Sequence, residues 1–360
     1  MRLKEEHPKK FDDVEWILSP TTWLLYRLRY PKGKKWENLK TDWTNALKFG
    51  ADITRSPKWF EPLFKDAKIS TDLLPEITSP GTLTGPAQGN FARKLNLEGA
   101  ELYQGLTDGN ASILAMGCLK QGDYGISCGS TSVPKFVSES IKPHKALYYH
   151  KHPIEGFLAG AAFETGIILR WFCEKVLGKN QKKGLDLARK VEAGKEYEFY
   201  PQGDRSPFFD PNLGNTLTKI WPDLSLSEEE SQGRLVRSIA TGIAMEEYIY
   251  IPLLEDLFNE NIEKVYLLGG GAPSKDDPFH WWNELRTSIW NKKVIKMEPR
   301  TTVGPLIPSA LLANIFEDVE EASEALLRKE SAIERSEEVA KIYHAKKEKF
   351  YERWKKLKNL

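Results

Sequence analysis

The sequence predicts an α/β protein in which helices flank a sheet. Apolar runs typical of buried strands alternate with helical patterns in the last third of the chain. The strands are expected at residues 264–268 and 293–297, and the helices at 281–290 and 308–316. Strands and helices in this order pack as a sheet covered by helices. The length of 360 residues is enough for two domains with substantial cores.

Composition excludes several classes of protein. The 52 basic and 51 acidic residues give a net charge of +1, so no surface for nucleic acid or membrane is indicated. Cys118, Cys128 and Cys173 stand in apolar contexts and fit reduced, buried thiols in a cytoplasmic protein. His150 and His152 are a close pair without nearby cysteines, so we expect no metal site of protein ligands. The first residues lack a signal peptide, and no apolar run reaches membrane-spanning length.

The first hundred residues predict short elements joined by loops. Ser19 suits a helix cap and Pro20 suits the first helical position, so a helix is expected from there to residue 30. Further short helices are expected at 41–49, 57–64 and 88–95, and a strand at 101–106.

The stretch 107–132 holds residue types suited to phosphate chemistry. The apolar spacing over 113–119 predicts a helix with Asp108 at its start, and 124–128 is a predicted strand. Gly129, Ser130, Thr131 and Ser132 then form a predicted polar hairpin turn, whose N–H groups and hydroxyls can bind an anion. A carboxylate facing such a turn suggests phosphoryl transfer. An N-capping Asp followed by an ordinary hairpin is the alternative.

The middle and end of the chain predict larger elements. Strands are expected at 145–152 and 156–162, a helix at 163–176, and a long ordered loop, of a kind that is often functional, at 197–222. Ser227 and Glu230 have the spacing of a capping box that opens a helix reaching residue 257. The tail 317–360 is expected to be helical. Its docking stripe comprises Ile342, Tyr343, Phe350, Tyr351 and Trp354.

A run of small residues follows the predicted strand 264–268. Gly269, Gly270, Gly271 and Ala272 would let another backbone or a flat ligand approach closely. The run matches neither a Walker loop nor a dinucleotide-binding fingerprint. A simple packing turn is the alternative.

The order of these motifs resembles the FGGY-family carbohydrate kinases. The segments that carry the resemblance are TDGNAS (107–112), SCGSTS (127–132), GFLAGAAFETGIILRW (156–171), PQGDRSPFFDPN (201–212) and VYLLGGGAPS (265–274). Their style is closest to D-ribulose and xylulose kinase-like members. The resemblance implies an actin-like ATPase (ribonuclease-H-like) fold. We expect a partial N-terminal, sugar-side lobe at 1–106, a nucleotide-binding C-terminal lobe at 107–316, and a docked helical tail at 317–360.

The same resemblance implies roles for individual residues. Asp108 falls where the family has the catalytic base, which binds the sugar and accepts the proton of its attacking hydroxyl. The implied nucleotide-binding residues are Gly129, Ser130, Thr131, Gly166, Gly269, Gly270, Gly271, Ala272 and Ser274. ATP and Mg²⁺ are the implied cofactors. Arg205, in the GDRSP segment, is interpreted as a structural arginine that holds its loop.

One departure from the family concerns the phosphate-binding turn D-x-G-T-[ST], which this sequence lacks. We therefore expect a kinase, or the major fragment of one, that phosphorylates a pentulose such as D-ribulose or D-xylulose. The expected partners are a separately encoded N-terminal fragment, which would complete the first lobe, or a second copy of the chain in a homodimer. The sequence leaves open whether this chain is active by itself. The alternative is a non-catalytic remnant or subunit that binds nucleotide or sugar.

Overall fold

The computed structural model describes residues 2–221, 223–270 and 276–358. The chain forms two compact units that are interleaved along the sequence. Unit 1 comprises Met1–Ala115, His150–Phe157 and Arg300–Leu326, and unit 2 comprises Met116–Tyr149, Leu158–Pro299 and Leu327–Leu360. The predicted linear division at residues 106 and 316 differs from these units and stays a prediction about the lobes.

Unit 1 is built from short helices and two-stranded sheets. Its helices are α1 (Arg2–Glu6), α2 (Pro8–Asp12), α3 (Pro20–Arg29), α4 (Trp43–Leu47), α5 (Glu61–Asp66), α6 (Asn90–Lys94), α7 (Asp108–Ala115), α12 (Leu306–Leu312) and α13 (Val319–Leu326), with 3₁₀ turns at Thr71–Leu73 and Thr301–Val303. Strand β1 (Lys40–Asp42) pairs in parallel with β4 (Glu76–Thr78). The antiparallel pairs are β2 (Ala51–Asp52) with β3 (Lys58–Trp59) and β5 (Leu83–Pro86) with β6 (Glu101–Tyr103).

The predicted start of α3 is confirmed. The N–H of Thr22 donates to the Ser19 hydroxyl over 3.1 Å, and Pro20 is the first helical residue. The other predicted elements of unit 1 are present but shorter, and strands precede α4 and α5. The helix expected at 308–316 begins at Leu306 and ends at Leu312.

Among the described residues, the principal sheet has eight strands in the order β16-β15-β14-β7-β8-β10-β9, with β11 paired to β8. Their bounds are β7 (Tyr124–Cys128), β8 (Thr131–Ser138), β9 (Tyr148–Lys151), β10 (Phe157–Gly160), β11 (Phe163–Glu164), β14 (Lys264–Gly269), β15 (Lys293–Met297) and β16 (Lys329–Ile333). The apolar strand β14 lies parallel to both β7 and β15. The sheet therefore brings the ends of β7 and β14 side by side.

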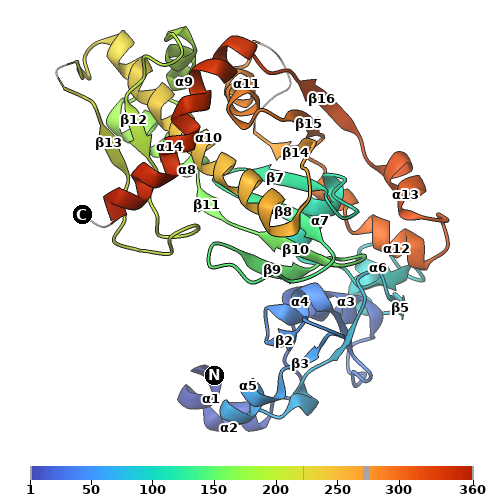
Figure 1. Cartoon of the computed structure of the whole chain (residues 1–360). Helices are drawn as coiled ribbons and strands as arrows, with labels where there is room; N and C mark the ends of the chain where they lie inside the picture. Colours follow the sequence, from blue (N-terminus) through green and yellow to red (C-terminus); the bar gives the residue numbers. More distant parts are fainter. Residues whose placement is uncertain (1, 222, 271–275, 359–360) are drawn as a thin grey trace. The chain divides into compact units, whose positions relative to one another are not determined.

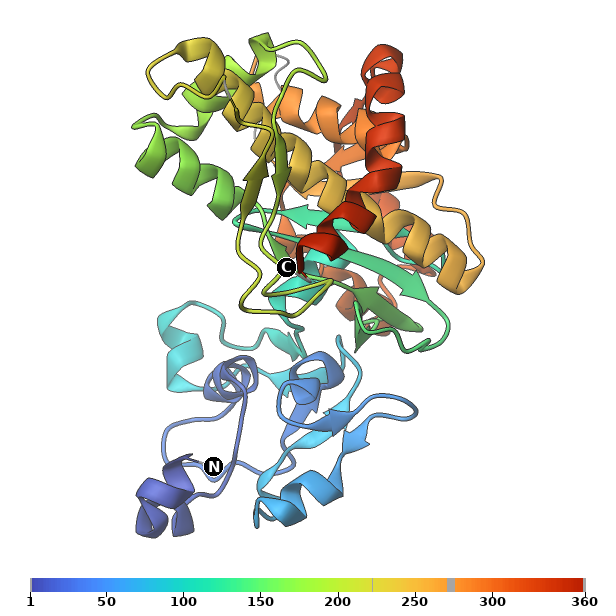
Figure 2. The same ribbon diagram turned by 60° about the vertical axis from the view of Figure 1, so that its left-hand side comes forward.

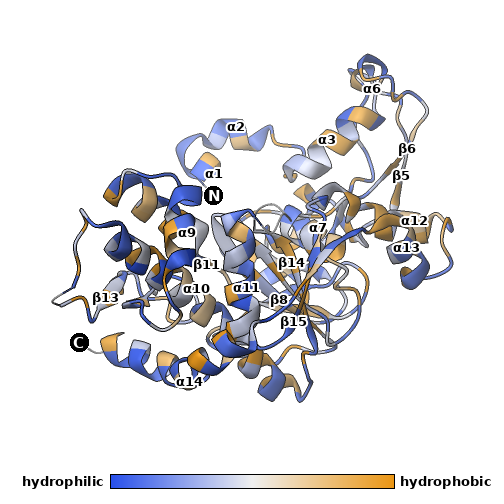
Figure 3. Ribbon diagram, turned by 90° about the horizontal axis from the view of Figure 1, so that it is seen from above, coloured by the Kyte–Doolittle hydropathy of each residue, from blue (hydrophilic) through white to orange (hydrophobic). Residues whose placement is uncertain are grey.

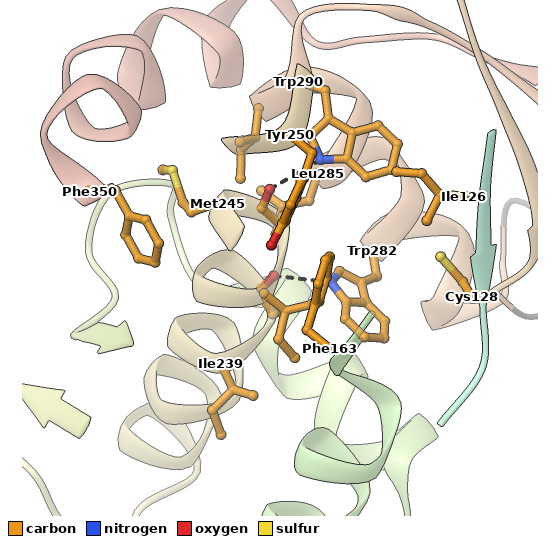
Figure 4. Close-up of a cluster of buried hydrophobic side chains, with 14 of the residues drawn as sticks. Ile126, Cys128, Phe163, Ile239, Met245, Tyr250, Trp282, Leu285, Trp290 and Phe350 are labelled. Carbon is orange, nitrogen blue, oxygen red and sulfur yellow. Dashed lines mark hydrogen bonds between the residues drawn. The ribbon is translucent and has the colours of Figure 1, made fainter. Parts of the chain in front are cut away.

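In the described part of unit 2, five helical segments accompany this sheet. They are α8 (Gly166–Trp171) with its π-helical continuation Phe172–Val176, α9 (Gln181–Lys190), α10 (Glu229–Phe258), α11 (Pro278–Trp290) and α14 (Glu337–Lys358). Helix α10 lies against the sheet, with α11 and α14 packed beside it (Figures 1 and 2). The indole N–H groups of Trp282 and Trp290 donate to the carbonyls of Ala240 and Ala244 over 3.1 Å each, which fastens α11 to α10 (Figure 4).

Two expectations about the C-terminal half are wrong. The tail is not helical throughout, because β16 adds an antiparallel strand beside β15. An edge strand tolerates charged side chains, and the charges of this segment hid the strand in the sequence. The loop expected at 197–222 contains the antiparallel pair β12 (Glu198–Tyr200) and β13 (Thr216–Thr218). These strands are three residues long and stand among turn-forming residues.

The expected capping box at Ser227 is also wrong. Helix α10 begins at Glu229, and no side chain caps its first turn. Instead the preceding loop folds over that turn: the N–H of Ser225 donates to the Ser231 hydroxyl over 2.8 Å. The helix expected at 163–176 starts later, because 163–164 form β11, and it ends in the π-helical turn.

The aromatic stripe of α14 is packed into unit 2. Trp354 is 0% exposed, and its ring meets that of Phe208 edge-on at 4.8 Å between centroids. The ring of Tyr351 stacks on the ring of Phe208, with 5.9 Å between the centroids. Hydrophobic and hydrophilic residues alternate along α14 (Figure 3), as a helix with one buried face requires. None of the described helices is both long and apolar enough to cross a membrane.

We predict that Trp354→Ala lowers the free energy of unfolding by about 3–5 kcal/mol, because it leaves a large cavity under α14. Urea unfolding followed by circular dichroism measures the change. Trp221→Ala is the control, since Trp221 is 89% exposed, and it should unfold like the parent chain. Equal stability of the two variants would contradict a docked α14.

Candidate functional site

The turn between β7 and β8 is fixed by backbone hydrogen bonds. It consists of Gly129 and Ser130 alone, because Thr131 already opens β8. The Gly129 N–H donates to the Thr131 carbonyl over 2.9 Å. The Ser130 carbonyl accepts from the N–H groups of Thr165 and Ile167, over 3.2 and 3.0 Å. The hairpin turn predicted at 129–132 is therefore shorter, and it is tied to the start of α8.

Gly166, the first residue of α8, lies directly against this turn. A Cβ atom at position 166 would lie 2.2 Å from the Gly129 carbonyl oxygen, so no larger residue fits without movement of the turn. The Gln181 side-chain amide donates to the Gly166 carbonyl over 3.0 Å. The predicted nucleotide-binding residues Gly129, Ser130 and Gly166 are thus neighbours.

The glycine turn after β14 packs on the end of β7. Gly269 has φ +86°, and a Cβ there would lie 2.2 Å from the Cys128 carbonyl oxygen. The N–H of Gly270 donates to that same carbonyl over 3.2 Å, and Asn283 of α11 donates its side-chain N–H to the Gly270 carbonyl over 2.9 Å. For Gly269 the packing interpretation therefore holds. The predicted residues Gly271, Ala272 and Ser274 lie outside the described residues.

A cavity of about 220 Å³ opens where these segments meet. Its lining includes Gly129, Ser130, Gly166 and Gly270, together with residues of α8, α9 and α11. Thr131 and Gly269, the other described residues of the predicted set, lie in the adjoining strands and do not line it. Binding sites for whole small ligands usually measure about 300–1,000 Å³, so this cavity suits a part of a nucleotide.

The lining offers charge and donors rather than a nucleophile. Arg170 of α8 brings a guanidinium group to the cavity, a group whose donors match phosphate oxygens. The thiol of Cys128 also borders it. Burial raises the pKa of this thiol to about 11, so Cys128 stays protonated near neutral pH and is not a reactive thiolate.

A buried ion pair borders the cavity, because Arg286 is one of the lining residues. The guanidinium of Arg286 donates through Nε and Nη2 to the two carboxylate oxygens of Glu247, over 2.9 and 3.1 Å. Its Nη1 donates to the Asn283 side-chain oxygen over 3.1 Å, and the Ser132 hydroxyl donates to Glu247 over 2.7 Å. Sequence reasoning missed this pair. The carboxylates Glu246 and Glu247, within the buried length of α10, are the signal that could have found it.

Asp108 is the first residue of α7 and is exposed within unit 1. Its carboxylate accepts the N–H of Gly109 over 2.7 Å. Thr107 takes the capping place, because its carbonyl accepts the N–H of Ala111 over 2.9 Å and its hydroxyl accepts from the Asn110 side chain over 2.8 Å. Asp108 is therefore not the N-cap that the alternative interpretation supposed.

A buried aspartate supports the approach to α7. The Thr107 N–H donates to the Thr44 hydroxyl over 2.9 Å. The N–H of Thr44 and the side-chain amide of Asn45 donate in turn to the carboxylate of Asp42, over 2.9 and 2.6 Å. Burial raises the pKa of Asp42, against these donors. The spacing Asp-x-Thr-Asn is a helix-cap signal that sequence reasoning did not use.

Arg205, between β12 and β13, lies near a carboxylate of β11. The Arg205 guanidinium lies 3.8 Å from the Glu164 carboxylate, which agrees with a structural arginine. Within the described ranges, no group of three or more His, Cys, Asp or Glu side chains is placed to hold a metal ion.

Comparison with known proteins identifies distant relatives. No protein-family model matches the chain. A xylulose kinase of Staphylococcus epidermidis is 20% identical over 352 residues, which cover 95% of this chain and 67% of that protein. A glycerol kinase of Haloferax volcanii is 22% identical over 321 residues, which cover 84% of this chain and 58% of that protein. The chain thus spans about three fifths to two thirds of these relatives.

Solved structures superpose on nearly the whole chain. A ligand-bound xylulose kinase from Lactobacillus acidophilus superposes with a TM-score of 0.80 at 18% identity, covering 99% of this chain and 70% of that one. A Plasmodium falciparum glycerol kinase solved with ADP gives a TM-score of 0.79 at 17% identity, covering 98% and 70%. These proteins share the fold, and the predicted actin-like ATPase fold is confirmed.

We predict that Gly166→Ala lowers the free energy of unfolding by about 1–3 kcal/mol, because the added methyl group overlaps the Gly129 carbonyl. This loss should occur even though alanine favours helices more than glycine does. Gly129→Ala is the matched control, since its nearest contact would be 3.9 Å away. Chemical denaturation of both variants tests the contact, and an unchanged stability of Gly166→Ala would contradict it.

Proposed function

We propose that this chain, a sugar kinase that belongs to the FGGY-type carbohydrate kinases, transfers the γ-phosphoryl group of ATP to a hydroxyl of a pentulose such as D-xylulose or D-ribulose. Xylulose kinases stand among both its sequence relatives and its structural neighbours, which supports a pentulose over other sugars. We assign nucleotide binding to unit 2 and the base to Asp108.

The observation that carries the nucleotide assignment is the meeting of separate motifs at one cavity. Gly129 and Ser130, Gly166, and Gly270 come from three segments far apart in the sequence, and all line the same space. Glycines let a ligand approach the backbone closely. Arg170 and Ser130 supply polar side chains to the same space, and preorganised donors of this kind stabilise the charge that develops on a phosphoryl group during transfer.

The residues that line the cavity fit a nucleotide. It contains glycine backbone, the Ser130 hydroxyl and the Arg170 guanidinium, with aromatic rings from Phe279 and Trp282. Donors and a cation suit phosphate oxygens, whereas aromatic rings suit a base, so the residues fit. Mg²⁺ is usually held by one or two carboxylates together with the substrate's phosphates. We therefore assign it to the bound nucleotide rather than to a dedicated protein cluster.

Asp108 has the properties that a general base needs. Its carboxylate is exposed and therefore accessible to a sugar, and its backbone is anchored through Thr107 to the buried Asp42 network. In the proposed reaction, Asp108 accepts the proton of the attacking hydroxyl while the phosphoryl group moves to that oxygen. A positioned base of this kind contributes about 10²–10⁴-fold to the rate, and positioning and electrostatics supply the rest.

We predict that Asp108→Asn lowers kcat by about 10²–10⁴-fold, since the amide cannot accept the proton, and leaves the Kd for MgADP unchanged. ADP release in the presence of ATP, Mg²⁺ and D-xylulose, D-ribulose or glycerol measures kcat, and calorimetry measures Kd. Asp66→Asn is the control, because Asp66 is likewise an exposed aspartate in a helix of unit 1.

Three results would each reject a part of this proposal. A parent chain that binds MgADP but releases no ADP with any of the three sugars would contradict catalysis by this chain alone. An Asp108→Asn variant that turns over as fast as the parent chain would contradict the role of the aspartate. Faster turnover with glycerol than with either pentulose would reject the pentulose assignment.

A further inference from the structure

The ion pair between Glu247 and Arg286 connects all the segments that meet at the cavity. Through Asn283, Arg286 reaches the carbonyl of Gly270 in the turn after β14. Through the Ser132 hydroxyl, Glu247 reaches β8 just beyond the Gly129-Ser130 turn. The two charged residues stand on α10 and α11, so they join these two helices to strand β8 and to the turn after β14.

The same network extends to the start of α8. The Ser132 hydroxyl lies 3.1 Å from the hydroxyl of Thr165, the residue directly before Gly166. The backbone N–H of Thr165 also donates to the Ser130 carbonyl. The three backbone segments are therefore linked to the ion pair by chains of two or three hydrogen bonds.

Burial makes this arrangement rigid. The side chains of Arg286 and Glu247 are 2% and 0% exposed, and the guanidinium lies over the Trp282 ring at 3.8 Å. Arg286 donates to three side-chain oxygens at once, and its planar fork fixes their relative positions. A buried pair of this kind often adds little to stability compared with apolar residues of similar volume. Stability alone therefore does not explain why the chain has a charged pair at this position.

We propose that Glu247 and Arg286 are a pair of positioning residues that hold the Gly129-Ser130 turn, the start of α8 and the Gly270 turn in the spacing that binds a nucleotide's phosphate groups. The identity of the ligand rests on the proposed function. The pair acts through Ser132, Thr165 and Asn283. Because Arg286 also lines the cavity, a readout without nucleotide is needed to separate positioning from direct contact with the ligand.

The experiment removes the pair without leaving a lone buried charge. In the double variant Glu247→Leu with Arg286→Met, apolar side chains of similar volume fill the site. We expect the melting temperature to stay near that of the parent chain, while the Kd for MgADP rises at least about tenfold, because displaced donors no longer converge. Calorimetry with MgADP and thermal unfolding provide the two values.

A second buried pair of unit 2 provides the matched control. Arg237 and Glu196 lie 3.5 Å apart, with side chains 4% and 3% exposed, and neither lines the cavity. Glu196→Leu with Arg237→Met should leave the Kd for MgADP at the parent value. If the first double variant does not fold, the single variant Arg286→Lys replaces it. Lysine keeps the positive charge but lacks the planar guanidinium that donates to several oxygens at once. This variant should raise the Kd for MgADP by less than the tenfold expected of the double variant.

Amide hydrogen exchange separates this inference from the proposed function. If the pair positions the cavity walls, the N–H groups of Gly129, Ile167 and Gly270 should exchange faster in the first double variant than in the parent or control chains, with no nucleotide present. A parent chain that fails to bind MgADP would reject the proposed function, and the exchange rates would still decide the inference. Unchanged exchange together with parent-like MgADP affinity would overturn it.

Discussion

The candidate site depends on two close contacts between backbone segments, one between the start of α8 and the turn after β7, the other between the end of β14 and the end of β7. Gly166 lies against the Gly129 carbonyl, and Gly269 lies against the Cys128 carbonyl, each with no room for a side chain. Both contacts involve residues at the end of β7 or directly beyond it, so the parallel pairing of β7 with β14 sets their position. The cavity exists because backbone, rather than side chains, forms much of its wall.

Side chains then stabilise what the backbone defines. Around the cavity, charged and polar groups of α10 and α11 secure the turns from behind. In unit 1 the buried Asp42 plays a comparable part, because it anchors Thr44, which anchors Thr107 next to Asp108. In both units an accessible candidate residue is backed by a buried carboxylate with several donors, an arrangement that limits movement of the loop.

Local sequence patterns predicted the parts of the chain that are locally determined. The strands β7, β14 and β15 were predicted to within one residue, because each is a short apolar run. Strand β16 was missed, since its charged residues are accommodated only at a sheet edge. The glycine motifs indicated the nucleotide site, whereas the pairing of Glu247 with Arg286 joins residues 39 positions apart. Such a pairing depends on how two helices pack and has no local signature.

The central claim is that the cavity in unit 2 binds a nucleotide. Photolabelling with 8-azido-ATP, followed by mapping of the modified peptides, tests it most directly. The account predicts saturable labelling, displaced by excess ATP, in peptides that contain Arg170, Gln181 or Phe279, which line the cavity. Labelling confined to peptides of unit 1, or labelling that excess ATP does not displace, would contradict the claim.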